Sequence, residues 1–243
     1  MTPHYWNDAK KHLSAACPVM KTIIASYHGE EGLRAREDGF YTLIRAIAGQ
    51  QISVKAADAV WAKLEKAVNP LTPENLLRKR EPTLRKCGFS GQKVAYARNV
   101  ARFWVERGIH GNTPSVCHPG VGRDPYQTTR QYVGMDPGLR RGDALIGNAY
   151  WSHLSDEEVI AQLTSIKGIG TWTAEMFLIF HLLRPDVLPL KDLGLLKAID
   201  LHYTGGQRLT VKEYQALSAA WEPYRTVATW YLWRALDPVP VAY

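Results

Sequence analysis

Apolar residues recur along most of the chain with the spacing of an α-helix. In the stretch that begins at Phe40 they fall at intervals of three, one and three positions, which places them on one side of a helix. Four further stretches repeat this pattern, and no stretch alternates apolar and polar residues convincingly enough to predict a strand. The apolar stripes consist of Phe40, Leu43, Ile44 and Ile47; Ala57, Val60, Trp61 and Leu64; Val94, Ala97, Ala101 and Trp104; Val159, Ile160 and Leu163; and Val227, Trp230 and Tyr231. We therefore predict an all-α fold.

Residue types that favour helix N-termini precede these stripes. Ser and Thr accept a hydrogen bond from a backbone N–H of the first turn, and a Glu three residues later completes a capping box. The predicted helix starts are Ser53, Thr72 followed by Pro73, Ser90, the pair Ser155 and Glu158, the pair Thr210 and Glu213, and Pro223. The sequence Gly49-Gln50-Gln51-Ile52 interrupts the periodicity and predicts a turn between the first two helices.

The helical segments fall into two groups. We expect one folded unit, residues 1–243, in which residues 40–117 and 144–243 form two helical subdomains with a cleft between them. The second subdomain would contain a helix-hairpin-helix motif and the C-terminal helices, and residues 1–39 can pack with either subdomain. Residues 118–143 lack a helical stripe and have Pro or Gly at 8 of 26 positions, which predicts an inserted surface segment.

Residues 118–143 allow two interpretations. Arg123, Arg130, Arg140 and Arg141 could contact phosphates as part of a binding loop. Alternatively, the segment is an insertion that the fold tolerates, because the entropy cost of closing a loop grows slowly with its length. We favour the insertion, since the apolar stripes on both sides are complete without it.

The composition is that of an ordinary globular protein, with 46% hydrophobic and 22% charged residues among 243. The sequence contains no apolar run long enough for a membrane span and no secretory signal, so we expect a cytoplasmic protein. Cys17, Cys87 and Cys117 are far apart and form no CxxC or Cys/His cluster. We therefore expect neither a zinc site nor an iron–sulfur cluster.

The charge is unevenly distributed. The formal net charge is +7, which weakly favours a polyanionic partner. Residues 1–143 contain 22 Lys and Arg against 13 Asp and Glu, a net +9, whereas residues 144–243 contain 8 against 10, a net −2. If nucleic acid is the partner, the C-terminal part must therefore bind it through backbone amides and a few placed side chains.

The sequence Lys167-Gly168-Ile169-Gly170-Thr171 predicts a hairpin between two helices. Glycine allows a tight turn and the close approach of another backbone. The unpaired N–H groups at the start of the helix after Gly170 suit a phosphate. An ordinary turn between helices remains the alternative, whereas a nucleotide-binding loop is excluded by the missing third Gly and the missing strand before it.

Asp192 follows the hairpin by 22 residues, in the sequence Leu188-Pro189-Leu190-Lys191-Asp192. It lies where a helix restarts after a proline-containing loop. Asp is a preferred N-cap, so a purely structural role is one interpretation. A catalytic carboxylate is the other.

In combination these motifs resemble the helix-hairpin-helix/Gly-Pro-Asp superfamily of DNA glycosylases, and within it the 3-methyladenine DNA glycosylase II group. Four separated stretches carry the resemblance, which covers residues 40–235 apart from the insertion. They are Ile44–Ser53, Gly88–Lys93, the hairpin through Asp192, and Trp221–Trp233. The resemblance implies base excision from double-stranded DNA containing alkylated bases, by a monomer that is associated with the nucleoid, in a bacterium.

The resemblance makes Asp192 the catalytic residue. An alkylated base such as 3-methyladenine or 7-methylguanine is cationic and leaves as a neutral molecule, so one carboxylate suffices where ordinary glycosidases need two. Asp192 would stabilise the positive charge that develops on the sugar and help to orient water.

The resemblance also implies DNA contacts at both motifs. Gln51 falls at the position of the wedge that fills the space of the extruded base, although it could instead satisfy the backbone at the helix break. Gln50 and Ser53 would hold that turn. The hairpin residues Lys167, Gly168, Ile169, Gly170 and Thr171 would bind the DNA backbone.

Aromatic residues are the candidates for the base pocket, since an electron-rich wall suits a cationic base. Trp172 follows the hairpin and aligns with the family's base-binding Trp, although a core position is the alternative. Trp221 and Tyr224 are weaker candidates for the opposite wall, and Arg225 would bind phosphate or pair with an acid. Met176 departs from the aromatic residue of some relatives, which puts the tightness of the pocket in doubt.

Trp172 also bears on the type of reaction. Family members that cut the DNA backbone have a Lys there, so we expect no lyase activity. A cation on the hairpin carbonyls near Thr164, Lys167 and Ile169 is possible, and we expect no other cofactor and no metal site formed by side chains. The alternatives are a non-catalytic helix-hairpin-helix DNA-binding protein, a glycosylase/lyase of the endonuclease III kind, and an enzyme inactivated by the insertion.

Overall fold

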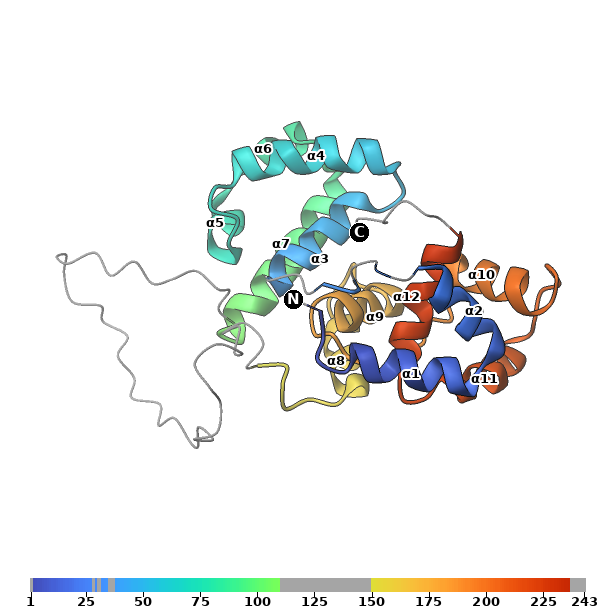
Figure 1. The fold of residues 1–243 in the computed structure, drawn as a ribbon. Coiled ribbons are helices and arrows are strands. Elements are labelled where there is room, and N and C mark those ends of the chain that lie inside the picture. The colour runs from blue at the N-terminus through green and yellow to red at the C-terminus, as the bar shows by residue number, and fades with distance from the viewer. Residues whose placement is uncertain (1, 28, 30–31, 35–37, 110–149, 237–243) are drawn as a thin grey trace.

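The computed structural model describes residues 2–27, 29, 32–34, 38–109 and 150–236, and within these ranges every regular element is a helix. The predicted all-α fold is confirmed (Figure 1). The helices are α1 (Trp6–Ala16), α2 (Pro18–Ser26), α3 (Gly39–Gly49), α4 (Val54–Ala67), α5 (Pro73–Arg78), α6 (Glu81–Lys86), α7 (Gly91–Glu106), α8 (Asp156–Thr164), α9 (Thr171–Phe180), α10 (Leu193–Tyr203), α11 (Val211–Ser218), the short 3₁₀ helix η2 (Ala219–Trp221) and α12 (Arg225–Leu236).

The predicted helix starts depend on local hydrogen bonds, and all but one are confirmed. In each confirmed case the hydroxyl accepts a hydrogen bond from the backbone N–H three residues ahead, and both capping boxes are complete. The last helix begins at Arg225 rather than Pro223. Tyr224 instead ends a turn, since its N–H donates to the carbonyl of Trp221 at 2.7 Å. The first bond of helical spacing runs from the N–H of Ala228 to the carbonyl of Tyr224.

The helices form two groups that meet at α3, α7 and α9. In Figure 1, α4, α5 and α6 lie together above α3 and α7, while α8 to α12 form the other group. Helices α1 and α2 pack against α12, and α1 also touches η2. The described part of residues 1–39 that forms helices therefore packs with the C-terminal helices.

Aromatic side chains join the two groups in a common core. Trp104 of α7 packs against Trp151, with ring centroids 5.7 Å apart, and Trp151 packs against Phe177 of α9 at 5.2 Å. All three rings are almost completely buried. This contact fixes α9 relative to α3 and α7, and so fixes the walls of the cavity described below.

Two further predictions from the sequence concern the insertion and membrane spans. The predicted insertion, residues 118–143, lies outside the described residues, as do its four arginines. No helix of the described part is long and apolar enough to cross a membrane.

Candidate active site

The predicted hairpin joins α8 to α9, as the sequence indicated. Ile166 and Ile169 are buried and anchor it, while Lys167 between them is exposed. Gly168 has φ +112°, and a Cβ atom there would lie 2.2 Å from Cγ of Tyr96. The close approach that this glycine allows is therefore to the protein's own helix α7.

Helix α7 holds the hairpin and the turn after α3 in place. Asn99 donates from Nδ2 to the carbonyl of Lys167 at 3.1 Å. Lys93 donates from Nζ to the carbonyl of Ala48 at 2.8 Å, and burial lowers the pKa of this lysine. No feature of the sequence pattern marked Lys93 or Asn99 for these roles, because both bonds join segments far apart in the chain.

The Gln50-Gln51 turn lies beside the hairpin. Gln50 ends α3 and donates from Nε2 to the carbonyl of Gly168 at 3.3 Å, so it links the two motifs that the sequence analysis treated separately. Gln51 is exposed and has φ +59°, an uncommon conformation for a residue with a side chain. Ser53 caps α4 as predicted, accepting from the N–H of Ala56 at 3.4 Å.

The carboxylate of Asp192 is buried, with 5% of the residue exposed, and accepts three hydrogen bonds. Oδ1 accepts from the backbone N–H of Leu195 at 2.6 Å, which makes Asp192 the N-cap of α10, and from Nε1 of Trp233 at 2.9 Å. Oδ2 accepts from Nε1 of Trp172 at 2.8 Å. Both oxygens are thus oriented, and the structural and catalytic interpretations of Asp192 are compatible.

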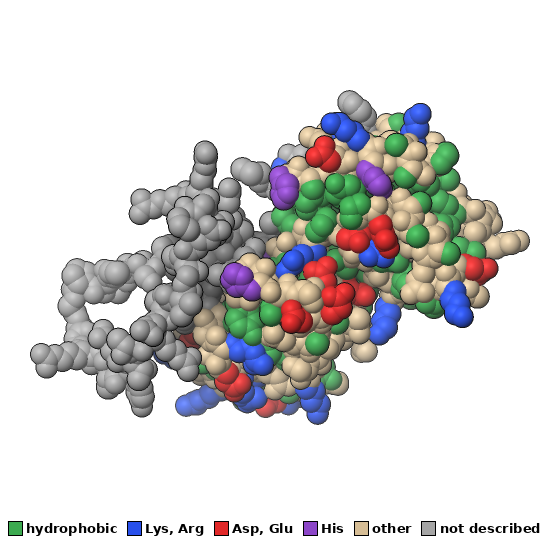
Figure 2. All heavy atoms as spheres, turned by 90° about the horizontal axis from the view of Figure 1, so that it is seen from below, with side chains coloured by type: hydrophobic (Ala, Val, Ile, Leu, Met, Phe, Trp, Pro, Cys, Tyr) green, Lys and Arg blue, Asp and Glu red, His purple; other side chains and the backbone are tan. Residues whose placement is uncertain are grey.

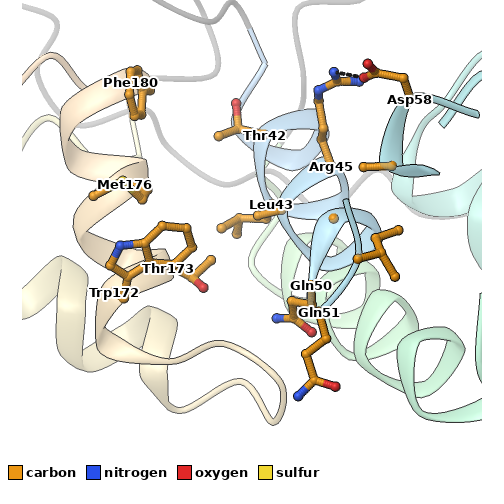
Figure 3. Close-up of a pocket in the computed structure, with 14 residues that line it drawn as sticks. Thr42, Leu43, Arg45, Gln50, Gln51, Asp58, Trp172, Thr173, Met176 and Phe180 are labelled. Atoms are coloured by element: carbon orange, nitrogen blue, oxygen red, sulfur yellow. Dashed lines mark hydrogen bonds and ion pairs between the residues drawn. The ribbon is translucent and has the colours of Figure 1, made fainter. Parts of the chain in front are cut away.

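A cavity of about 380 Å³ opens beside Trp172, between α9 and the turn that joins α3 to α4 (Figure 3). The lining side chains are mostly apolar. The lining residues are Thr42, Leu43, Arg45, Ala46, Gly49, Gln50, Gln51, Ile52, Ala57, Asp58, Trp172, Thr173, Met176 and Phe180. Trp172 therefore contributes to the cavity wall while its indole nitrogen contacts Asp192, and the cavity has the dimensions of a small-molecule site.

Arg45 and Asp58 line the cavity on the side of α3 and α4. Their side chains form an ion pair, with Nη2 of Arg45 2.8 Å from Oδ1 of Asp58. The Arg45 guanidinium also lies over the ring of Trp61, at 5.4 Å from its centroid. The ion pair partly neutralises the positive charge of Arg45, so Arg45 repels a cationic ligand in the cavity less strongly.

The residues predicted for the opposite wall of the base pocket lie away from this cavity. Trp221 is fully buried and packs beside Tyr203 in the core. Tyr224 stacks on Tyr5 with ring centroids 6.2 Å apart, and neither residue lines the cavity. The N-terminal helix α1, whose residue His12 packs against Tyr224, covers this side of the protein.

Arg225 pairs with acidic residues, which is the second of the two roles considered for it. Its guanidinium contacts both carboxylate oxygens of Asp186 at 2.8 Å, and lies 2.7 Å from Oε1 of Glu222. Two acids therefore compete with any phosphate for this side chain.

Trp233 is the functional candidate that sequence reasoning missed. It lies on α12, 41 residues from Asp192, and its ring stacks on Phe180 of the cavity wall with centroids 5.8 Å apart. Gly194 leaves room for the carboxylate, since a Cβ atom there would lie 3.1 Å from Oδ1 of Asp192, whereas the Trp233 ring would be in ordinary contact at 3.7 Å. The only available signal was its place in the fourth resembling stretch, which does not separate it from Trp230.

The face shown in Figure 2 carries charges of both signs. Figure 2 shows one face on which acidic and basic side chains are both scattered, with acidic side chains gathered near its centre. The hairpin offers backbone groups instead, because Gly170 is exposed and α9 begins at Thr171 directly after it.

A buried carboxylate thus lies beside an indole-lined cavity, next to a hairpin between two helices of an all-helical fold. The family model of the HhH-GPD superfamily base excision DNA repair protein matches residues 44–223. The chain is 31% identical over 234 residues to DNA-3-methyladenine glycosylase 1 of Schizosaccharomyces pombe, covering 93% of this chain and 86% of that protein. The chain belongs to the HhH-GPD superfamily of base excision DNA repair proteins.

Two solved structures agree with this assignment. A DNA-3-methyladenine glycosidase from Bacillus halodurans superposes with a TM-score of 0.66 and 32% identity, covering 91% of this chain and 90% of that chain. The 3-methyladenine DNA glycosylase of S. pombe in complex with abasic DNA superposes with a TM-score of 0.69 and 28% identity, covering 93% and 95%.

Proposed function

We propose that this protein is a monofunctional DNA glycosylase that hydrolyses the N-glycosidic bond of alkylated bases, of the 3-methyladenine and 7-methylguanine type, in double-stranded DNA. The observation that carries the proposal is the position of Trp172, which lines the cavity and donates a hydrogen bond to the buried Asp192. In this arrangement the Trp172 ring can stack on the base, and the Asp192 carboxylate next to it can face the sugar. The names of the relatives support the same substrate class.

The chemistry requires one carboxylate. The N-glycosidic bond breaks with its electron pair moving to the cationic base, which departs neutral and needs no general acid. The sugar becomes positive at C1′, and the Asp192 carboxylate stabilises that charge in a water-poor site. Water then adds to C1′ and loses a proton, which Asp192 can accept. The product is an abasic site.

Gln51 and the hairpin are the proposed DNA contacts. Extrusion of the base from the stack costs a few kcal/mol. Gln51, an exposed residue that lines the cavity, would fill the space left behind (Figure 3). The backbone N–H groups that begin at Gly170 and Thr171 would hold a phosphate next to the lesion, with Lys167 nearby. The proposed partner is lesion-containing DNA at the nucleoid, bound by a single copy of the protein.

A cation on the hairpin carbonyls is a separate proposal. Carbonyl oxygens suit a hard cation, and each has two lone pairs. The carbonyls of Lys167 and Gly168 already accept one hydrogen bond each, from Asn99 and Gln50. The carbonyl of Lys167 thus retains one lone pair for a cation.

The direct test of the proposed function is base release. Double-stranded DNA treated with a methylating agent is incubated with the protein, and the released bases are separated by chromatography. Release of 3-methyladenine or 7-methylguanine supports the proposal. Binding of the DNA without any released base would favour a non-catalytic helix-hairpin-helix protein instead.

We expect no β-elimination of the DNA backbone. Lys191 precedes the carboxylate in the chain, and its Nζ donates to Oγ1 of Thr171 at 3.2 Å. By the family resemblance, Trp172 stands where the lyases have their lysine. Reaction in the presence of borohydride should therefore leave no covalent protein–DNA adduct on a denaturing gel, and the abasic strand should remain intact. A strong trapped band that disappears in Lys191→Met would identify Lys191 as a nucleophile and contradict the assignment.

Trp172→Ala should reduce the excision of cationic lesions more than that of neutral ones, by about tenfold. The ring supplies cation–π attraction that only a cationic base can use, of about 0.5–2 kcal/mol. Single-turnover rates on 7-methylguanine and hypoxanthine measure the difference. Trp172→Phe is the matched variant, since it keeps the ring and loses the hydrogen bond to Asp192, and it should lower both rates alike. Equal losses on both lesions in Trp172→Ala would assign Trp172 to positioning alone.

A further inference from the structure

Glu175 lies on α9 next to the loop that carries the catalytic carboxylate. Thr171 and Trp172, four and three residues before it, share its side of the helix. Both contact that loop, since Thr171 accepts from Lys191 at 3.2 Å and Trp172 donates to Asp192 at 2.8 Å. Glu175 therefore faces the same loop one helical turn further along.

One oxygen of the Glu175 carboxyl group lacks a hydrogen bond within the described residues. Its Oε2 atom is shielded from solvent and accepts no hydrogen bond from any described residue. Burial raises the pKa of Glu175 to about 7, the nearby ammonium of Lys191 opposes this change, and the charge of Asp192 adds to it. The group thus changes its charge in the physiological range, beside a carboxylate that the proposed mechanism keeps ionised.

Resting on the proposed function, we propose that Glu175 supports Asp192 electrostatically: the charge on its carboxyl group adds to that of Asp192 in the electric field at the sugar bound beside that carboxylate. Glu175 does not line the cavity, so it does not touch the base. The charged groups that act on it are Lys191 and Asp192.

The sign of the effect follows from the charges. Below its pKa, Glu175 is neutral and contributes no field. Above its pKa, its negative charge adds to that of Asp192 and stabilises the positive charge that develops on the sugar, while Lys191 offsets part of it. The rate of base release should therefore rise by about threefold as the pH increases through about 7, the order expected for one charge acting through partly hydrated protein.

The test is a single-turnover pH profile on DNA containing 3-methyladenine, a cationic base that has no ring N–H proton to lose between pH 6 and pH 8. At a saturating protein concentration, the measured rate does not depend on the affinity for DNA. We expect the wild-type rate to rise about threefold, and Glu175→Gln to stay flat at the low-pH rate. Lys191→Met should move the midpoint to higher pH, and Glu106→Gln, on the exposed end of α7, should keep the wild-type profile. A rise that Glu175→Gln retains would overturn the inference.

Thermal unfolding provides a readout that does not depend on activity. The raised pKa means that the folded protein binds the Glu175 proton more tightly than the unfolded chain, so this contribution to stability is complete at low pH and is lost as the pH rises through about 7. Between pH 5 and pH 8 the Tm of wild type should fall by about 5 °C relative to Glu175→Gln. A constant difference would overturn the inference, whatever the activity. A pH-dependent difference in a protein that releases no base would instead overturn the proposed function.

Discussion

Asp192→Asn should lower the single-turnover rate of base release by about a thousandfold while leaving the affinity for DNA within about threefold of wild type. The substitution removes the negative charge that stabilises the sugar cation, and electrostatic groups of this kind contribute on the order of 10²–10³ in rate. The structure adds a second effect. An amide has one acceptor oxygen, so it cannot accept from both Leu195 and Trp233 on one side and from Trp172 on the other.

The loss of one hydrogen bond should also appear in stability. If the amide oxygen of Asp192→Asn keeps the N–H groups of Leu195 and Trp233, the indole N–H of Trp172 loses its acceptor, which costs about 1–3 kcal/mol. Asp38→Asn is the matched control, because Asp38 caps α3 by accepting from Tyr41 at 3.1 Å and makes no indole contact in the described structure. This control should keep its stability within about 0.5 kcal/mol and its full activity, since Asn caps a helix as well as Asp does. Near-normal turnover of Asp192→Asn would remove Asp192 from the mechanism.

Gly168→Ala should lower the free energy of unfolding by about 2–4 kcal/mol and weaken DNA binding by about tenfold. The φ of +112° is unfavourable for any residue with a side chain, and the new methyl group would overlap the ring of Tyr96 at 2.2 Å. The hairpin would have to move away from α7, which would break the bonds from Asn99 and Gln50 to the hairpin carbonyls. Chemical denaturation and a binding titration with abasic DNA measure the two effects.

Gly170→Ala separates protein packing from DNA contact within the same hairpin. A Cβ atom on Gly170 meets no atom within 4 Å, and its φ of −96° suits any residue. We expect its stability to stay within about 0.5 kcal/mol of wild type, so any loss of DNA affinity would report the approach of a phosphate. Adding Tyr96→Ala to Gly168→Ala should restore part of the lost stability by removing the overlap. If Gly168→Ala is as stable as Gly170→Ala, the packing argument for this glycine is wrong.

The helices and their starts could be predicted because their causes are local. The stripe from Phe40 to Ile47 needs only the helical period, and the bond from Ser155 to Glu158 spans three residues. The exception at Pro223 is also local, since the turn from Trp221 to Tyr224 delays the start of α12 to Arg225. Secondary structure in this chain therefore follows from neighbours within one helical turn.

The two chemical motifs could be located but not completed from the sequence. The hairpin and the capping role of Asp192 rest on short-range geometry, and the structure brings Asp192 and Trp172 together. The second indole on Asp192, from Trp233, comes from the far end of the chain. The burial that raises the pKa of Glu175 likewise depends on the residues that pack against α9, which no local sequence pattern encodes.

The placement of the other aromatic candidates has the same origin. Trp221 and Tyr224 became candidates for the pocket because they are aromatic residues of a stretch that resembles the family. Only the packing of α1 and η2 decides that Trp221 lies in the core and that Tyr224 stacks on Tyr5. The sequence by itself determined the helices, the hairpin and the capping carboxylate, because each depends on hydrogen bonds within a few residues. The tertiary structure decided which aromatic rings reach that carboxylate, because burial and contact depend on the whole chain.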